Sequence, residues 1–207
     1  TPSKWLGAWV KNSFLQEYTV KVINNGIDTS QFFPIESDIK KRYRIEDKFV
    51  MLGVATSWND MKGYSDYLKI AELLGEDFKI VLVGLTKRQI EKLPSGIVGI
   101  ERTTSVQELA EIYTASDLFL NLSYCENYPT VNIEAMACGT PVLTYKTGGS
   151  PEIIEKYGGI VVKQGDISYV VELCKKFKEK KLEITNRFCS EENDNFTVIQ
   201  EYLKLYI

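Results

Sequence analysis

The sequence predicts an α/β protein with a doubly wound fold, in which helices cover both faces of a parallel β-sheet. Short runs of consecutive apolar residues alternate along the chain with segments in which apolar residues recur every three or four positions. The runs lack the polar and apolar alternation of half-exposed strands, so both faces of each strand are expected to be buried. With 207 residues, the chain can form one large domain or two small ones.

Apolar runs mark the expected strands. The five clearest runs are Phe49–Val54, Lys79–Gly84, Asp117–Leu122, Pro141–Tyr145 and Gly159–Lys163. A shorter run covers Ile97–Ile100, and Val20–Ile23 near the start of the chain is also predicted to be a strand. The Asn24–Gly26 segment that follows Val20–Ile23 is a strong turn signal.

Helical spacing of apolar residues marks the segments between these strands. Three apolar stripes have this spacing: Tyr67, Ile70, Ala71 and Leu74; Val106, Leu109, Ala110 and Tyr113; and Val170, Leu173, Cys174 and Phe177. We expect all three to pack in the core. Ser3 is suited to cap a helix over Lys4–Asn12, and Asn193–Ile207 is predicted to be a last amphipathic helix. Because β and α segments alternate, the sheet is expected to be parallel.

Composition excludes several classes of function. The 25 basic and 28 acidic residues give a net charge of −3, which argues against a broad grip on nucleic acid. The chain has no histidine and therefore no histidine-based catalytic triad. It has no pair of cysteines two residues apart, and we expect reduced thiols in a cytoplasmic protein. No apolar run approaches the roughly 20 residues of a membrane span. The four cysteines are Cys125, Cys138, Cys174 and Cys189.

The segment Cys125–Glu152 is the richest in chemical signals. It follows an expected strand, and Pro129 is suited to the first position of a helix that ends at Gly139. In parallel sheets, ligands bind beyond the carboxyl ends of the strands, at the switch point of the strand order. A helix that starts at this edge offers free N–H groups and a favourable dipole to a phosphate. The free N–H groups would be those of Thr130, Val131 and Asn132.

Two glutamates flank this expected phosphate site. Glu126 lies before the helix and Glu134 about one turn inside it. Carboxylates accept hydrogen bonds from sugar hydroxyls, so the pair suggests a ligand with a sugar on each side of its phosphates, as in a nucleoside diphosphate sugar. An isolated pair at this spacing is more often a helix cap and a solvated surface residue. The proline start, the glycine stop and the preceding strand favour the binding site.

Residues after two other strands add to the site. Gly148 and Gly149 permit close approach of the backbone to a ligand, although this segment taken alone is better explained as an ordinary turn with a cap at Ser150. Lys62 places a cation near the end of Phe49–Val54, as a diphosphate requires, although such spacing also fits a surface lysine.

These motifs together resemble the retaining glycosyltransferases of family 4, also called group 1, which have the GT-B fold. The family has two glutamates separated by seven residues and then E-A-x-A-x-G-x-P-V, which here is EAMACGTPV from Glu134. Four other stretches are also similar to the family: the TGGSPE segment, Arg102–Tyr124, Val22–Pro34 and Lys62–Gly63. The resemblance covers essentially the whole chain and implies a Rossmann-like domain.

The resemblance implies a role for each matching residue. Glu126 would contact the donor sugar, Glu134 the ribose, and Lys62 the diphosphate leaving group. The backbone N–H groups after Glu126 would bind the donor sugar or its phosphates, and the base would lie against the loop after Ile97–Ile100. The further residues implied in donor binding are Tyr128, Thr130, Val131, Gly148 and Gly149 around the sugar and phosphates, and Glu101 and Arg102 at the base.

One position departs from the family. Many members have an arginine five residues before the lysine, where this chain has Ser57. The leaving-group charge would then rest on Lys62 and the helix dipole, with help from Arg102, which puts phosphate affinity in question. The loop variant that contains Trp58 looks like a subgroup that makes bacterial surface polysaccharides such as lipopolysaccharide or capsule.

The resemblance also implies a division of the chain. Residues 1–23 would be the end of an N-terminal domain with a lead-in strand, 24–192 the donor-binding domain, and 193–207 a helix that packs back toward the N-terminal domain. The intact enzyme would transfer a hexosyl group from a UDP-sugar to a glycan or lipid-linked acceptor. Without an Asp-x-Asp motif, no obligatory metal or cofactor is expected. The donor-binding half alone should bind nucleotide but transfer little of the sugar. Any association with a membrane should belong to the intact protein.

Two alternatives remain open at this stage. A nucleotide-sugar epimerase of the GT-B type would share much of the pattern, but the A-C-G-x-P-V stretch disfavours it. A non-catalytic α/β module of the receiver or flavin-binding kind is the other alternative. A receiver needs an aspartate after an early strand, and Gly53–Ser57 and Gly84–Thr86 contain no acidic residue.

Overall fold

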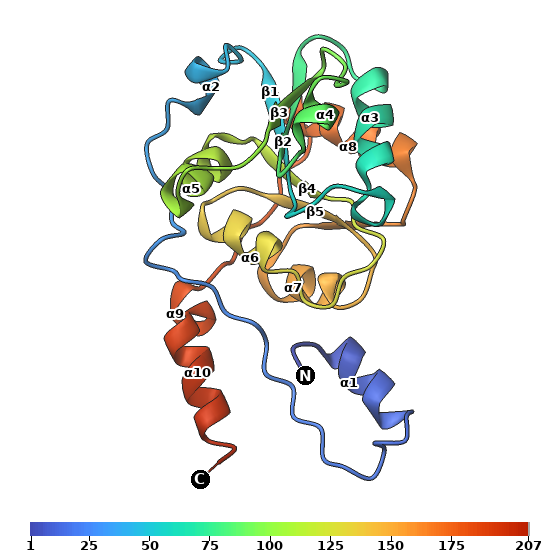
Figure 1. Cartoon of the computed structure of the whole chain (residues 1–207), viewed down its shortest axis with the longest axis vertical. Coiled ribbons are helices and arrows are strands. Elements are labelled where there is room, and N and C mark those ends of the chain that lie inside the picture. The colour runs from blue at the N-terminus through green and yellow to red at the C-terminus, as the bar shows by residue number, and fades with distance from the viewer. Residues whose placement is uncertain (207) are drawn as a thin grey trace.

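A six-stranded parallel sheet forms the centre of the computed structural model, which describes residues 1–206 (Figure 1). The strand order is β3-β2-β1-β4-β5-β6, so the order reverses between β1 and β4. This confirms the predicted doubly wound, Rossmann-like α/β fold. The strands are β1 (Phe49–Val54), β2 (Phe78–Val83), β3 (Ile97–Ile100), β4 (Leu118–Asn121), β5 (Val142–Tyr145) and β6 (Ile160–Val162).

Successive residues of each strand enter two separate cores. On β1, Val50 and Leu52 pack on one face of the sheet and Met51 packs on the other, and all three are at most 2% exposed. On β4, Phe119 packs on the same face as Val50 and Leu52, and Leu120 packs on the same face as Met51. This division explains the continuous apolar runs, because each face of the sheet needs its own apolar side chains.

Helices cover both faces of the sheet (Figure 1). Helices α2 (Ile39–Arg42), α5 (Val106–Ala115), α6 (Thr130–Ala137) and α7 (Ser150–Tyr157) supply one core, and α3 (Tyr64–Leu73), α4 (Lys87–Ile90) and α8 (Ile167–Lys178) supply the other. The predicted apolar stripes lie on α3, α5 and α8 and pack in the two cores, but the expectation for Val106 is wrong, because its side chain at the start of α5 is 41% exposed. A 3-10 turn, η1 (Asp60–Lys62), leads into α3.

Helix α1 (Lys4–Lys11) is anchored to the region that contains the predicted phosphate site. The Ser3 hydroxyl caps it as predicted, by accepting from the Leu6 N–H at 3.0 Å, and donates to Asn127 Oδ1 at 2.6 Å. The two carboxylate oxygens of Glu152, in the first turn of α7, accept from the N–H groups of Lys4 and Trp5 at 2.9 and 2.8 Å.

Three expectations about elements are wrong. Val20–Ile23 is no strand, because it lies outside the sheet and its Ile23 N–H pairs only with the carbonyl of Thr1. Pro129 stands at the N-cap of α6 rather than at its first helical position. The predicted last helix is broken at Asp194, which caps α10 (Asn195–Leu203) after the short α9 (Ser190–Asn193). Ile207, part of that prediction, lies outside the described residues.

The C-terminal helices return to the N-terminal part of the chain. Ile27 forms an isolated bridge with Asp194, and the Tyr157 hydroxyl donates to Asn193 Oδ1 at 2.7 Å. As a result α1, α9 and α10 lie beyond the same end of the sheet, where both termini also lie (Figure 1). Within residues 1–206 no helix has the length and apolar character needed to cross a membrane. All four cysteines are free, as expected.

Candidate active site

A cleft of about 210 Å³ opens where the strand order reverses. The loops after β1 and β4 form its walls and the first turn of α6 forms one end. It therefore lies where ligands bind in sheets of this topology. Lys62, Glu126, Thr130, Val131 and Ser57, which are five of the predicted site residues, line it together. The other lining residues are Val54, Ala55, Thr56, Asn121, Ser123 and Pro129.

Helix α6 presents unused backbone donors to this cleft. The first helical residues, Thr130 and Val131, have N–H groups without an acceptor among residues 1–206. The expectation of a third free N–H at Asn132 is wrong, because that group donates to the Pro129 carbonyl at 3.2 Å. Gly139 ends the helix as predicted, with a φ of +83°. Two free donors and the positive end of the helix dipole suit an anion.

Lys62 and Glu126 face each other across the cleft. The Lys62 ammonium lies 2.6 Å from Glu126 Oε1, and the side chains are 38% and 13% exposed. Lys62 ends η1, where Gly63 adopts a φ of +72°. A Cβ on Gly63 would lie 2.2 Å from the Leu122 carbonyl oxygen, so glycine lets the lysine loop sit against the end of β4.

Glu134 lies one turn further along α6 and does not line the cleft itself. Its Oε2 accepts a hydrogen bond from the buried Tyr113 hydroxyl at 3.0 Å. Burial raises the pKa of the Glu134 carboxyl, against the opposing effect of hydrogen bonds from Tyr113 and Thr130. A partly desolvated carboxylate of this kind binds a hydroxyl group more strongly than a carboxylate in water does.

Two buried asparagines support the cleft and were missed by the sequence analysis. Asn121 Nδ2, at the end of β4, donates to Asn132 Oδ1 at 2.8 Å, and Asn121 Oδ1 accepts from the Ser123 N–H. Asn132 Nδ2 is buried without a partner among residues 1–206. The one available signal was a polar residue at the carboxyl end of the apolar run Asp117–Leu122.

Gly148 and Gly149 make a close approach to protein backbone. A Cβ on Gly148, whose φ is +51°, would lie 1.7 Å from the Glu126 carbonyl oxygen, and one on Gly149 would lie 2.3 Å from the Asn127 carbonyl oxygen. The Gly149 N–H donates to this second oxygen at 2.7 Å. The two glycines thus support the loop that carries Glu126.

The remaining predicted residues lie outside the cleft lining. The Tyr128 side chain is buried at 4% exposure in the core, and its carbonyl accepts from Asn25 Nδ2. Glu101 and Arg102 are exposed after β3, two strands away from β1 in the sheet. Among residues 1–206 no three histidine, cysteine or acidic side chains gather as metal ligands would.

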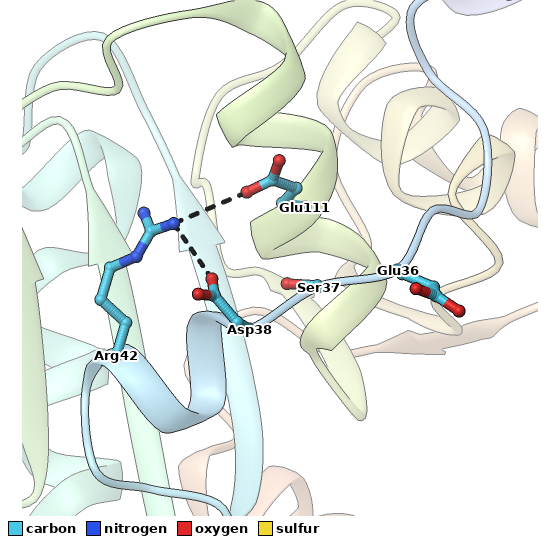
Figure 2. Close-up of a pocket in the computed structure, with 5 residues that line it drawn as sticks. All are labelled: Glu36, Ser37, Asp38, Arg42 and Glu111. Atoms are coloured by element: carbon cyan, nitrogen blue, oxygen red, sulfur yellow. Dashed lines mark hydrogen bonds and ion pairs between the residues drawn. The ribbon is translucent and has the colours of Figure 1, made fainter.

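A second hollow, of about 650 Å³, lies beside α2 and α5 (Figure 2). Its only cation, Arg42, contacts Asp38 at 3.0 Å and Glu111 at 3.9 Å, and Glu36 also lines it. Arg42 binds Glu108 at 3.0 Å as well. Acidic side chains surround this cation, so the hollow suits a phosphate far less than the cleft does.

Comparisons with known proteins give the family. A family model described as "Glycosyl transferases group 1" matches residues 35–195. The chain is 29% identical to a Campylobacter jejuni N,N'-diacetylbacillosaminyl-diphospho-undecaprenol alpha-1,3-N-acetylgalactosaminyltransferase, over 96% of this chain and 57% of that protein. The chain thus spans little more than half the length of this relative.

Solved structures share the fold. Sucrose-phosphate synthase from Thermosynechococcus elongatus has a TM-score of 0.81 at 20% identity, over 100% of this chain and 56% of that one. Anabaena HepE in complex with UDP has a TM-score of 0.82 at 19% identity, over 100% of this chain and 62% of that one, and the same protein is also solved with UDP-glucose. Because the family model covers most of the sequence, this chain belongs to the group 1 glycosyltransferases.

Proposed function

We propose that the cleft binds the diphosphate of a nucleotide sugar, as the donor domain of a retaining hexosyltransferase of family 4. The observation that carries this proposal is the meeting of Lys62, Glu126 and the free N–H groups of Thr130 and Val131 in one cleft. The N–H groups and the ammonium suit the diphosphate, and the Glu126 carboxylate suits hydroxyls of the sugar. Glu134 would accept from the ribose, and the base would extend toward Glu101 and Arg102.

The proposed chemistry is transfer with retention at the anomeric carbon. The bond from the sugar C1 to the diphosphate oxygen breaks, and a bond from C1 to an acceptor hydroxyl oxygen forms on the same face. The acceptor proton passes to the departing diphosphate. Lys62 and the α6 dipole stabilise the negative charge on the leaving group, and Glu126 orients the sugar. No step in this scheme requires a metal.

A UDP-sugar is the donor that we propose, because the cleft has the same fold around it as Anabaena HepE, which binds UDP and UDP-glucose. We also propose a glycan or lipid-linked acceptor in bacterial surface polysaccharide synthesis. The Campylobacter relative, whose name describes a diphospho-undecaprenol acceptor, supports it. The free thiols favour a reducing compartment, so we place the reaction in the cytoplasm.

The acceptor would come to the cleft on a second domain. Exposed apolar side chains occur on α1, on the segment after it, on α10 and just after α10. We call this set the apolar face, and it comprises Trp5, Trp9, Phe14, Leu15, Tyr18, Phe196, Ile199, Tyr202, Leu203 and Leu205. A hollow of about 640 Å³ within it is lined by residues from both ends of the chain, including Val10 and Leu205. Large exposed apolar patches mark interfaces. We propose that the acceptor-binding domain of the intact enzyme packs on this apolar face.

Calorimetric titration of the chain with UDP, GDP and ADP tests the donor site. We expect UDP to bind, and Glu134→Ala to weaken that binding about tenfold through loss of a hydrogen bond to a charged group. Glu111→Ala, on the neighbouring α5 and outside the cleft, is the matched control and should change the Kd less than twofold. Failure of all three nucleotides to bind, or equal effects of the two substitutions, would overturn the proposal.

A further inference from the structure

Three contacts besides the ion pair join the lysine loop and the first turn of α3 to the glutamate loop, and Tyr124 makes two of them. The Tyr124 N–H donates to the carbonyl of Met61, which directly precedes Lys62, at 2.8 Å. The Tyr124 hydroxyl donates to Asp66 Oδ2 at 2.8 Å. The third contact is the close approach of Gly63 to the end of β4. Tyr124 stands two residues before Glu126, so it lies at the point where the two loops meet.

Tyr124 is also joined to the loops after β5 and β6. Its carbonyl accepts from the Thr147 hydroxyl at 3.1 Å and from Gln164 Nε2 at 2.9 Å. One residue therefore connects the loops at the carboxyl ends of four strands, β1, β4, β5 and β6. Its backbone contacts would remain if the side chain changed, whereas the bond to Asp66 depends on the hydroxyl alone.

Asp66 is a buried acceptor in the first turn of α3. It is 5% exposed, and its Oδ2 receives the hydroxyls of both Tyr124 and Tyr145 at 2.8 Å. The two tyrosine rings pack edge to face with their centroids 5.6 Å apart. Burial, followed by the hydrogen bond and the charge of Asp66, raises the pKa of Tyr124 to about 12, so its hydroxyl stays a donor at neutral pH.

We infer that Tyr124, held by Asp66, is a positioning residue that sets the placement of Glu126 against Lys62. The inference rests on the proposed function for its effect on the donor, but the geometry it concerns is that of the loops themselves. A hydrogen bond to a buried carboxylate is among the stronger polar contacts in proteins. Loss of the hydrogen bond from Tyr124 releases the Glu126 loop from Asp66 on α3. Loss of the hydrogen bond from Tyr145 leaves that loop attached to Asp66.

Two matched substitutions separate positioning from general stability. Tyr124→Phe and Tyr145→Phe each delete one hydroxyl bonded to the same oxygen of Asp66 and keep the ring. Only Tyr124 belongs to the Glu126 loop, because Tyr145 is a fully buried residue of β5. Both variants should unfold at a lower temperature than the parent protein, since each loses a hydrogen bond to the buried Asp66, and the decrease should be larger for Tyr145→Phe because its bond is the more deeply buried.

The first measurement needs no ligand. Cys125 is exposed and directly precedes Glu126, whereas Cys138 and Cys174 are buried, so in a Cys189→Ser background the reaction with 5,5′-dithiobis(2-nitrobenzoate) reports on the loop. We expect Tyr124→Phe to raise the Cys125 rate several-fold and Tyr145→Phe to leave it within twofold. Equal rates in the two variants, or no change with Tyr124→Phe, would overturn the inference.

The second measurement links the loop to the donor site. We expect Tyr124→Phe to weaken UDP-glucose binding about tenfold while changing UDP binding less than threefold, because the proposed contact of Glu126 is with the sugar. Tyr145→Phe should leave both affinities unchanged. If the parent protein binds neither ligand, the proposed function fails while the labelling rates still decide the inference. If Tyr124→Phe and Tyr145→Phe weaken the binding of UDP and of UDP-glucose equally, the hydrogen bonds to Asp66 have only a structural role and the inference is wrong.

Discussion

Lys62 and Glu126 neutralise each other in the cleft. Their 2.6 Å contact places the carboxylate where it competes with any anion for the ammonium. If the proposed function holds, a diphosphate would have to displace Glu126 from Lys62, and a donor sugar would offer Glu126 hydroxyl groups in exchange. The two residues are thus expected to affect a nucleoside diphosphate and a nucleotide sugar in different ways.

The substitution Glu126→Gln tests this competition. We expect it to strengthen binding of UDP about fivefold, since a partly exposed ion pair contributes about 1 kcal/mol. The same substitution should weaken binding of UDP-glucose, because the amide replaces a charged acceptor. Calorimetry with both ligands measures the two effects, with Glu111→Gln as the control. Weaker binding of both ligands would show that Glu126 does not compete for Lys62.

Glu134 links the chemistry of the site to stability. Burial raises its pKa in the folded protein, so the folded state binds a proton more tightly than the unfolded state does. The contribution of neutral Glu134 to the free energy of unfolding is therefore fully present below the pKa that this residue has in the unfolded chain. This contribution is lost as the pH rises through the pKa in the folded protein. At neutral pH the charged carboxylate therefore destabilises the fold.

The substitution Glu134→Gln should remove this cost and keep the bond from the Tyr113 hydroxyl. We expect Tm at pH 7 to rise, because the substitution removes the charge that burial disfavours. The gain should vanish as the pH falls well below the ordinary pKa of a glutamate, about 4.3, because the parent carboxyl is then protonated in both states. Thermal unfolding of both proteins across this pH range measures the difference in Tm. A lower Tm at pH 7 would contradict the pKa direction, and UDP affinity should fall in either case.

At the scale of the elements, the loop that carries Glu126 depends on the turn before α7. Gly148 has a φ of +51° and no room for a Cβ beside the Glu126 carbonyl oxygen. Gly148→Ala should therefore lower Tm by about 4–8 °C, for a cost of about 2 kcal/mol, and weaken UDP-glucose binding by displacing Glu126. Gly75→Ala is the control, since nothing lies within 4 Å of its Cβ. Equal affinities in the two variants would contradict the proposed support.

The strands were predictable from sequence because burial on both faces leaves a continuous apolar run. Phe49–Val54 has the predicted bounds, and the other four long runs differ by one residue at one or both ends. Val20–Ile23 has the same composition but no neighbouring strand, and a short apolar run cannot show whether a partner exists. The break between α9 and α10 at Asp194 could not be predicted either, because it depends on the bridge to Ile27, which is far away in sequence.

The candidate site was predictable where residues follow strands next to the switch point. Lys62 and Glu126 follow β1 and β4, and the fold brings them together. Their direct pairing could not be predicted, because it depends on side-chain geometry between loops 64 residues apart. For the same reason the sequence suggested a ligand beside Gly148, whereas the structure places the Glu126 backbone there.

At the scale of the whole molecule, the chain holds the cleft at the carboxyl ends of β1 and β4 and the apolar face on α1 and α10. Ile199 on that face and Leu73 on α3 are 54% and 55% exposed. We expect Ile199→Gln to lower the fluorescence of bound 8-anilinonaphthalene-1-sulfonate by roughly a third, because this dye binds contiguous apolar patches. Leu73→Gln should leave the signal unchanged. Equal decreases would mean that the apolar face is no single patch.

We propose that transferase activity requires the acceptor-binding domain as well as this chain. Because the acceptor domain is proposed to complete the site, we expect the 207-residue chain to bind UDP-glucose and transfer little of it. Release of UDP, measured with an undecaprenyl-diphosphate-linked sugar as acceptor, checks this. Turnover comparable to that of a full-length relative would show that residues 1–207 hold both substrates by themselves.

The diphosphate of a nucleotide sugar is proposed to bind between Lys62 and the first turn of α6. Amide NMR of the 23.6 kDa chain during titration with UDP tests this proposal most directly. We expect the largest shifts at the N–H groups of Thr130 and Val131 and around Lys62. Shifts confined to the hollow around Arg42, or no shifts at millimolar UDP, would contradict it.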